Sequence, residues 1–357
     1  MAQKKYKELV GCLHMHSTYS DGSGTIAEIA RDAREAGLDY IMLTDHNNLK
    51  ALKNGEGGWQ DSLLVIIGYE INDLEDRNHY LAFGLEEEVE KGLPAKEYVR
   101  RVKEAGGFGF IAHPDEQRDV FPEHPPYPWT EWDTDDYQGI EIWNQMSEWM
   151  ENLSEWNKLW QVVNPRRSIL APMPVTLNKW DEVNMRRPVV GVGGVDAHAH
   201  KHPLLGGLFH VTIFRYKIQF KTIRTHLLVE PTYHRDLPAN LAEKKIFDAF
   251  LNCRAFISNY YVGDAQGFSA QVQNDAGRIT MGETIPFRPG SAMQVKLPEK
   301  GEARLIRNGQ LLRREEGRRI VFPIEKAGLY RLEINRKGRA WIFSNHFRIV
   351  NEKGQFD

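Results

Sequence analysis

The stretch GCLHMHSTYSDGSGT, residues 11–25, decides the fold, because an apolar run ends there in two histidines and a glycine-rich loop. His14 and His16 are two residues apart, and side chains two apart on a strand point to the same face. We therefore expect both imidazoles to enter one pocket. Asp21 follows in the loop and offers a carboxylate close to the same place.

Segments with strand and helix patterns alternate from this stretch onward. Thr25 and Glu28 form a capping-box pair at the start of an amphipathic helix, and Gly37 suits its end. Further strands are predicted at residues 8–16, 40–46, 63–71, 79–85, 108–114, 139–144 and 188–198, and further helices at residues 95–107 and 242–256. This rhythm is typical of an α/β fold with a parallel sheet or barrel.

The length of 357 residues favours two domains. Residues 1–262 are predicted to form a catalytic domain, with a tryptophan-rich insert at about residues 120–187. Short alternating runs in residues 263–357 predict a small antiparallel β-sandwich as an accessory domain. Asn308 and Gly309 predict a hairpin there, since both tolerate positive φ.

The composition limits which classes of protein and which kinds of partner are expected. No apolar run reaches the roughly 18 to 20 residues that span a bilayer, and the first residues lack the pattern of a secretory signal. With only Cys12 and Cys253, no disulfide framework is expected. The net charge of −3 gives no reason to favour nucleic acid or membrane as a partner. We expect a soluble cytoplasmic protein, and its oligomeric state stays open.

Residues that can ligate metal gather at the ends of the predicted strands. They are His14, His16, Asp21, His46, Glu70, His79, His113, Asp196 and His198. In βα barrels the C-terminal strand ends converge on the active site, so we expect these residues to be neighbours. Their nitrogen and oxygen donors suit divalent transition metals such as Zn, Mn or Fe. Two or three ions are expected, because one ion uses only about four ligands.

The order of these motifs, H-x-H, TDH, GYE, AHP and DAH, resembles the polymerase-and-histidinol-phosphatase (PHP) family. The resemblance extends over about residues 8–260. AWIFSN near the C-terminus resembles the β-rich tail of the branch that includes carbaryl hydrolase, although Asn345 is followed by His346 where that branch leads us to expect proline.

The resemblance implies a distorted seven-stranded (β/α)7 TIM-like barrel with a trinuclear metal site. It assigns His14, His16, Glu70 and Asp196 to the first metal, Glu70, His79 and His113 to the second, and Asp21, His46 and His198 to the third. Glu70 would bridge the first two metals, and Glu70 and Asp21 would act in catalysis.

Hydrolysis is the chemistry that such a ligand set favours. Two metals that share a carboxylate can hold a bridging water and lower its pKa, and a third can stabilise charge in the transition state. The leading prediction is a phosphoesterase acting on a small phosphorylated or nucleotide-like substrate. A carboxylic ester or carbamate hydrolase is the alternative, and a non-catalytic metal-bound binding module is the alternative from another class.

Four residues near the predicted ligands complete the candidate site. His200 continues the alternation after His198 and can give a proton to the leaving group, although an exposed loop position explains it equally well. Arg77, Arg118 and Lys201 are candidates for binding a substrate phosphate, and each is also an ordinary surface cation.

Overall fold

The computed structural model describes residues 6–118, 125–154, 156–204 and 209–357, with side chains for all of these except 158, 201–204 and 209–211. The helices are α1 (Ile26–Glu35), α2 (Lys50–Lys53), α3 (Ala95–Glu104), α4 (Gln145–Glu151), α5 (Lys158–Val163), α6 (Pro174–Arg186), α7 (Tyr216–Gln219) and α8 (Ala239–Leu251). The first ten strands are β1 (Lys7–Met15), β2 (Tyr40–His46), β3 (Gly58–Gln60), β4 (Leu63–Ile71), β5 (Tyr80–Phe83), β6 (Phe108–Ile111), β7 (Gly139–Asn144), β8 (Val190–Ala197), β9 (Lys201–Leu204) and β10 (Phe209–Thr212). The others are β11 (Ile223–Val229), β12 (Ala255–Asn259), β13 (Ser269–Asn274), β14 (Gly277–Ile279), β15 (Thr284–Pro286), β16 (Ala292–Arg307), β17 (Gln310–Pro323), β18 (Gly328–Arg336), β19 (Arg339–Ser344) and β20 (Phe347–Val350).

The chain divides into two compact units. We name them the barrel unit, Val10–Pro172 with Gly193–Arg224, and the tail unit, Met1–Leu9 with Met173–Val192 and Thr225–Asp357. The tail unit therefore takes in α6 and α8 as well as the C-terminal strands. The predicted boundary after residue 262 stays a prediction.

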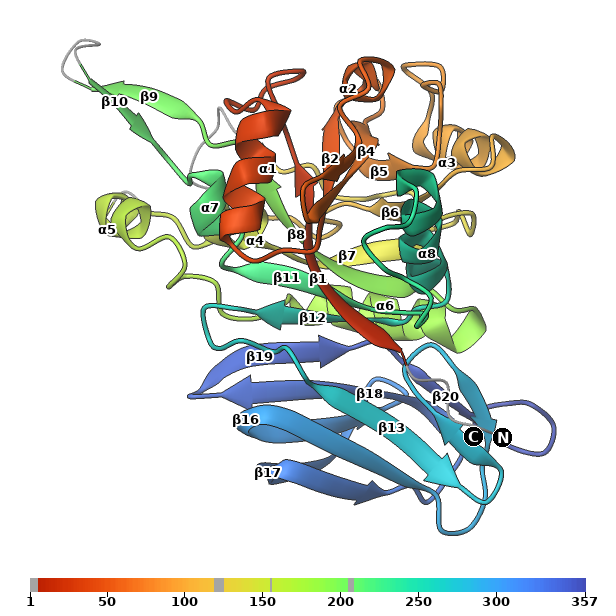
Figure 1. Cartoon of the computed structure of the whole chain (residues 1–357). Helices are drawn as coiled ribbons and strands as arrows, with labels where there is room; N and C mark the ends of the chain where they lie inside the picture. The colour runs from red at the N-terminus through yellow and green to blue at the C-terminus, as the bar shows by residue number, and fades with distance from the viewer. Residues whose placement is uncertain (1–5, 119–124, 155, 205–208) are drawn as a thin grey trace. The chain divides into compact units, whose positions relative to one another are not determined.

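Seven strands of the barrel unit pair in the order β8–β1–β2–β4–β5–β6–β7 (Figure 1). They belong to a closed barrel, which confirms that part of the expected fold. β8, β1, β2 and β4 are parallel neighbours, as are β6 and β7, whereas β5 is antiparallel to both β4 and β6. The link from β4 to β5 contains no helix, so β5 returns beside β4 and interrupts the predicted alternation.

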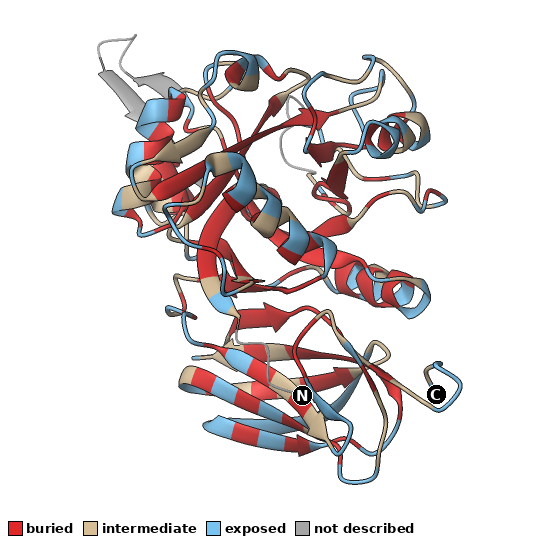
Figure 2. Ribbon diagram, turned by 45° about the vertical axis from the view of Figure 1, so that its right-hand side comes forward, coloured by how far each residue is buried: buried red, intermediate tan, exposed pale blue. Residues whose placement is uncertain are grey.

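Burial in the barrel unit follows the sequence pattern. β4 is buried at every residue, and Figure 2 shows the strands largely in red and the outer faces of helices in blue. α1 has the predicted capping box, in which Thr25 Oγ1 accepts from the backbone N–H of Glu28 at 3.3 Å. Such a cap stabilises a helix by about 1 kcal/mol. No helix in the described ranges is long and apolar enough to cross a bilayer.

The tail unit is dominated by antiparallel strands around an apolar core. β16 pairs with β13, β17 and β18, and the core includes Phe322, Tyr330 and Trp341. The hairpin between β16 and β17 is confirmed, with Asn308 at φ 49° and Gly309 at φ 79°. Positive φ at both turn positions is what this sequence pair tolerates best.

A buried ionic cluster in the tail unit explains the unexpected histidine after Asn345. His346 Nε2 lies 2.7 Å from Asp181 Oδ1, and Arg331 donates to both oxygens of Asp181 at 2.7 and 2.8 Å. Burial alone raises the pKa of Asp181, but the contacts to His346 and Arg331 lower it to about 2. A proline could not supply the second partner of this carboxylate.

The tryptophan-rich insert does not form one packed body. Trp143 on β7 lies in the core of the barrel unit, whereas Trp180 on α6 belongs to the tail unit. Trp156 is 98% exposed. The tryptophans therefore serve separate packing roles.

Candidate metal centre

The structure brings all nine predicted ligand residues together within the barrel unit. They form four overlapping groups, and within each group the ligand atoms lie within 4.8 Å of one another. They are His16, Asp21, His46 and His198; His14, His16 and Glu70; His14, His113 and Asp196; and His46, Glu70 and His79. Overlap between the groups shows that the nine residues form one continuous cluster.

Glu70, at the end of buried β4, lies at the centre of the cluster. Its Oε2 is 3.1 Å from His14 Nε2 and 3.2 Å from His16 Nε2. Its Oε1 is 2.6 Å from His79 Nδ1 and 3.5 Å from His113 Nε2. His46 Nδ1 also lies 3.6 Å from Oε2. The two oxygens therefore face different sets of imidazoles, an arrangement that allows one carboxylate to serve two metal positions.

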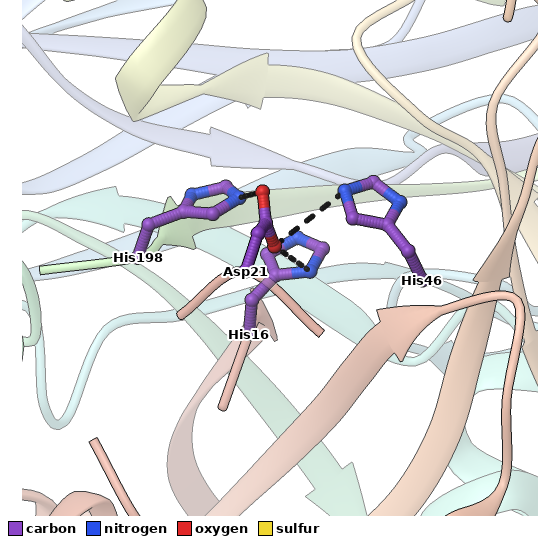
Figure 3. A group of neighbouring side chains, drawn as sticks. All are labelled: His16, Asp21, His46 and His198. Atoms are coloured by element: carbon purple, nitrogen blue, oxygen red, sulfur yellow. Dashed lines mark ion pairs between the residues drawn. The ribbon is translucent and has the colours of Figure 1, made fainter. Parts of the chain in front are cut away.

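Asp21 gathers a second set of imidazoles at the half-exposed edge of the cluster (Figure 3). Its Oδ2 is 3.2 Å from His198 Nε2, and its Oδ1 is 3.7 Å from His16 Nδ1 and 3.8 Å from His46 Nε2. His16 and His46 each turn their other ring nitrogen toward Glu70. These two histidines therefore lie between the buried and the half-exposed parts of the cluster.

The backbone is strained where three of these residues project into the cluster. His14, His113 and Asp196 have φ of 64°, 25° and 50°. Such conformations cost of order 1–3 kcal/mol for residues other than glycine and concentrate at functional sites. The pairing of β1 with β8 also shifts register between Leu13 and Met15. His14 and His16 both reach Glu70, although the strand between them is irregular.

Asp45 supports the loop that carries Asp21, and the sequence analysis missed it. The backbone N–H and Oγ of Ser17 both donate to Asp45 at 2.7 Å, and Ser20 Oγ donates at 2.8 Å. Asp45 is buried near the C-terminal end of β2. A carboxylate in a predicted buried strand was the available signal, since such groups are rarely buried without a partner.

Glu141 on β7 is a second carboxylate that the sequence analysis missed. It is buried, and its Oε1 lies 2.9 Å from Nδ1 of His14. The signal was again an acidic residue in an apolar strand, here GIEIWN at residues 139–144.

Electrostatics within the cluster favour a bound cation. Burial opposes charge on Glu70 and Asp196, yet His14 and its neighbours hold the pKa of both carboxyls well below the usual range. Burial also opposes charge on His79, but Glu70 raises the pKa of His79 to about 10. At His46 burial prevails and lowers the pKa to about 4. Ionised carboxylates that hold protons on neighbouring imidazoles can exchange those protons for a divalent ion.

Within the described ranges, four buried ring nitrogens of the cluster lack a hydrogen-bond partner. They are both nitrogens of His16, Nε2 of His79 and Nδ1 of His113. Buried polar atoms are nearly always paired, so unpaired ones call for a ligand. Imidazole nitrogens beside carboxylate oxygens are a donor set for Zn, Mn or Fe. The residues present therefore fit the expected divalent metals.

A cavity of about 750 Å³ opens onto the cluster, and two of the four additional candidates line it. Arg118 lies on its wall, where its guanidinium pairs with buried Glu116. The exposed His200 also lines it, with its ring 5.0 Å from that of His198.

The two other cationic candidates contribute no described contact to the cavity. Arg77 is exposed and does not line it. The side chain of Lys201 lies outside the described residues.

Comparisons with known proteins agree with this geometry. Residues 13–115 match the model of the PHP domain. The uncharacterized protein MJ1587 of Methanocaldococcus jannaschii is 28% identical over 120 residues, which cover 29% of this chain and 66% of that protein. DNA polymerase/3′-5′ exonuclease PolX of Bacillus subtilis is 42% identical over 48 residues, or 13% of this chain and 8% of that protein. The chain thus spans just under two thirds of the first curated relative and less than a tenth of the second.

Among solved structures, the chain is similar to a two-domain protein from Bacteroides vulgatus that contains a predicted PHP-like metal-dependent phosphoesterase. The match covers 96% of each chain at 16% identity, with a TM-score of 0.45.

A barrel whose strand ends carry a buried cluster of histidines and carboxylates defines a class of metal-binding proteins. The match of residues 13–115 to the PHP-domain model confirms the resemblance read from the motifs. The matched residues 13–115 include seven of the nine cluster positions, all except Asp196 and His198. The further likeness to the carbaryl-hydrolase branch stays a prediction.

Proposed function

We propose that this protein is a metal-dependent hydrolase, and that it acts as a phosphoesterase on a small phosphorylated or nucleotide-like substrate. The convergence of nine ligand-type side chains in one cluster, seven of which line the cavity, is the observation that carries the proposal. A trinuclear site is the arrangement we propose, with His14, His16, Glu70 and Asp196 at one ion, Glu70, His79 and His113 at another, and Asp21, His46 and His198 at the last.

Bound divalent ions would supply Lewis-acid activation of water and of the substrate's oxygen. The side chains of the chain have separate parts in the proposed reaction. Glu70 holds two groups of imidazoles together through its two oxygens. His200, exposed beside His198, is proposed to give a proton to the leaving group. Arg118 is proposed to bind the substrate from the cavity wall, and Arg77 and Lys201 stay candidates without a described contact.

The proposal also includes four features beyond the activity itself, which concern the fold, the location and the partner. They are a (β/α)7 TIM-like repeat in residues 1–262, a β-sandwich in residues 263–357, a cytoplasmic location and a small-molecule partner. Each is an expectation from the sequence, and the parallel pairings of β8, β1, β2 and β4 support the first.

Hydrolysis of a carboxylic ester or carbamate is the second candidate. Apolar side chains, including Met146, Met150 and Ile213, line the cavity beside the cluster. Pockets of this kind bind substrates that are largely apolar, which favours uncharged esters over phosphate dianions.

Metal content is the first expected result. Protein purified without chelator should carry two to three equivalents of transition metal, because nine ligands exceed the demand of one ion. Elemental analysis measures this value. Less than half an equivalent, unchanged after reconstitution with Mn, Fe or Zn, would exclude the proposed centre.

Activity assays then separate the candidate functions. Metal-loaded protein should hydrolyse phosphomonoesters or phosphodiesters, lose that activity on chelation and regain it on reloading. Hydrolysis of aryl esters or carbamates alone would select the second candidate. Full metal content with no hydrolysis of any of these classes would favour the non-catalytic binding module.

A further inference from the structure

One part of the cavity lining, which we name the apolar wall, is apolar, although another part is the charged cluster. Met146, Trp149, Met150 and Leu153 line this wall, at the spacing i, i+3, i+4 and i+7 along α4 and the residue beyond its C-cap. This spacing places the four side chains on one face of the helix. Trp149 and Leu153 are buried, whereas Met146 and Met150 are half-buried and line the cavity.

Contacts on both sides fix the orientation of α4. Trp149 packs edge-on against Phe214, with ring centroids 4.4 Å apart, and both residues line the cavity. On another face of α4, Ser147 Oγ donates to buried Glu116 at 2.6 Å. The side chain of Asn144 also caps the helix at Ser147. These contacts hold α4 in place through residues other than the nine of the cluster.

The one positively charged lysine or arginine side chain described in the cavity lining is paired with a carboxylate of the protein itself. Among the described lining residues, Arg118 is the one arginine or lysine, and its guanidinium pairs with Glu116. It also lies over the ring of Tyr127, 5.7 Å from the centroid. This side of the cavity offers apolar surface and a paired cation, which suits an uncharged, bulky group better than a second anionic group.

We infer that this wall is a binding subsite for a bulky apolar group that the substrate carries next to the bond being cleaved. The inference rests on the proposed function, because it places the scissile bond at the metal cluster. The ligand class it names is an ester whose organic part is aromatic or branched aliphatic. Such a group removes apolar surface of Met146 and Met150 from water, and burial of this kind stabilises a complex.

Two pairs of matched probes test the subsite. Benzylphosphonate and methylphosphonate differ only in the apolar group, and their C–P bonds resist hydrolysis, so calorimetry on metal-loaded protein measures binding without turnover. We expect benzylphosphonate to bind at least tenfold more tightly. Benzyl phosphate and methyl phosphate release alcohols of similar acidity, so kcat/KM should favour the benzyl ester by a similar factor.

The outcomes separate the subsite from the proposed function. Equal binding of the two phosphonates overturns the subsite, whether or not the protein is a phosphoesterase. Tighter binding of benzylphosphonate without hydrolysis of either phosphate supports the subsite and contradicts phosphoesterase activity.

Substitution of Met150 locates the effect. Met150→Gln keeps the length of a half-buried side chain and adds polarity, so the preference for benzylphosphonate should fall at least threefold. Metal content and methylphosphonate binding should not change. Met185→Gln, at a 38% exposed methionine of the tail unit, is the matched control and should keep the full preference. If Met150→Gln does not fold, Met146→Gln replaces it, and an unchanged preference in the folded variant contradicts the inference.

A different observation carries a second inference, about Glu141. Its Oε1 lies 2.9 Å from His14 Nδ1, and its Oε2 accepts the backbone N–H of His113 at 2.9 Å. Asn144 Nδ2 donates to the same Oε2 at 2.9 Å. This buried carboxylate therefore contacts two residues of the cluster without facing the cavity itself.

We infer that Glu141 is a positioning residue for the metal centre. When it accepts the proton of His14 Nδ1, the Nε2 lone pair of His14 is directed toward Glu70 and Asp196, 3.1 and 3.5 Å away. Partners of this kind fix the orientation of a ligating histidine, and their loss weakens metal binding about 10- to 100-fold. The inference rests on the proposed metal centre and concerns no reacting atom.

Competition with a chromophoric chelator tests Glu141 by metal affinity rather than by activity. Glu141→Ala should bind its first equivalent of Zn²⁺ at least tenfold more weakly than the wild type. Glu141→Gln should restore part of the affinity, because its amide oxygen can still accept from Nδ1–H. If both variants fold, keep the wild-type affinity for Zn²⁺ and lose only thermal stability, the role of Glu141 is purely structural.

Discussion

Glu70→Gln should reduce turnover by at least 100-fold and remove about one equivalent of metal. The substitution keeps the size of the side chain but removes its negative charge. Both oxygens of Glu70 face imidazoles, at 3.1 Å from His14 Nε2 and 2.6 Å from His79 Nδ1, so the loss affects two parts of the cluster at once. A 100-fold fall corresponds to about 2.7 kcal/mol on the barrier. Elemental analysis and steady-state kinetics on the same preparation measure both effects.

Glu243→Gln is the matched control for this substitution. Glu243 is a half-buried carboxyl on α8 of the tail unit, and burial raises its pKa to about 6. Its amide variant should keep full metal content and turnover. If Glu70→Gln behaved like this control, the central carboxylate would be structural and the site would be misassigned.

The residues at the ends of the predicted strands were the most informative part of the sequence for locating the site. The segments at residues 40–46, 63–71 and 139–144 coincide with β2, β4 and β7. Their apolar residues are buried on both faces of the sheet, which gives strands rich in apolar residues with a polar residue at or near the C-terminal end. His46 and Glu70 stand at or next to those ends, so their convergence followed from the barrel geometry.

Carboxylates inside the strands were invisible to the same reasoning. Asp45 and Glu141 act on other residues of the protein, and their partners Ser17 and His14 lie far away in the sequence. Strand period shows that such a residue is buried, but it does not show which partner compensates its charge. Only the three-dimensional structure identifies these partners.

The contacts of the two candidate arginines were equally beyond the sequence. Arg77 and Arg118 each lie a few residues from a predicted ligand, yet Arg118 lines the cavity whereas Arg77 is exposed and does not. Loop conformation decides between them, and loops carry no periodic signal. The antiparallel direction of β5 was missed for a related reason, since a strand pattern does not encode its direction.

Gly194→Ala should weaken the metal centre at least as much as Glu141→Ala, although it removes no functional group. An added Cβ at this position of β8 would lie 1.8 Å from Glu141 Oε1 and 2.9 Å from the Cβ of His14. The carboxylate of Glu141 must then move, and it loses its contacts to His14 and to the backbone of His113. Hydrogen bonds to charged groups contribute about 1.5–3 kcal/mol each.

We therefore expect Gly194→Ala to lower turnover at least 100-fold and metal affinity at least tenfold, measured by kinetics and chelator competition. Gly317→Ala is the control, because a Cβ at that position of β17 would meet no atom closer than 3.3 Å. It should leave both quantities unchanged. A folded Gly194→Ala protein with wild-type metal affinity would mean that Glu141 can leave His14 without consequence, and the inferred positioning role would be wrong. If Gly194→Ala and Glu141→Ala combined weaken binding no more than Gly194→Ala alone, the two changes act through the same contact.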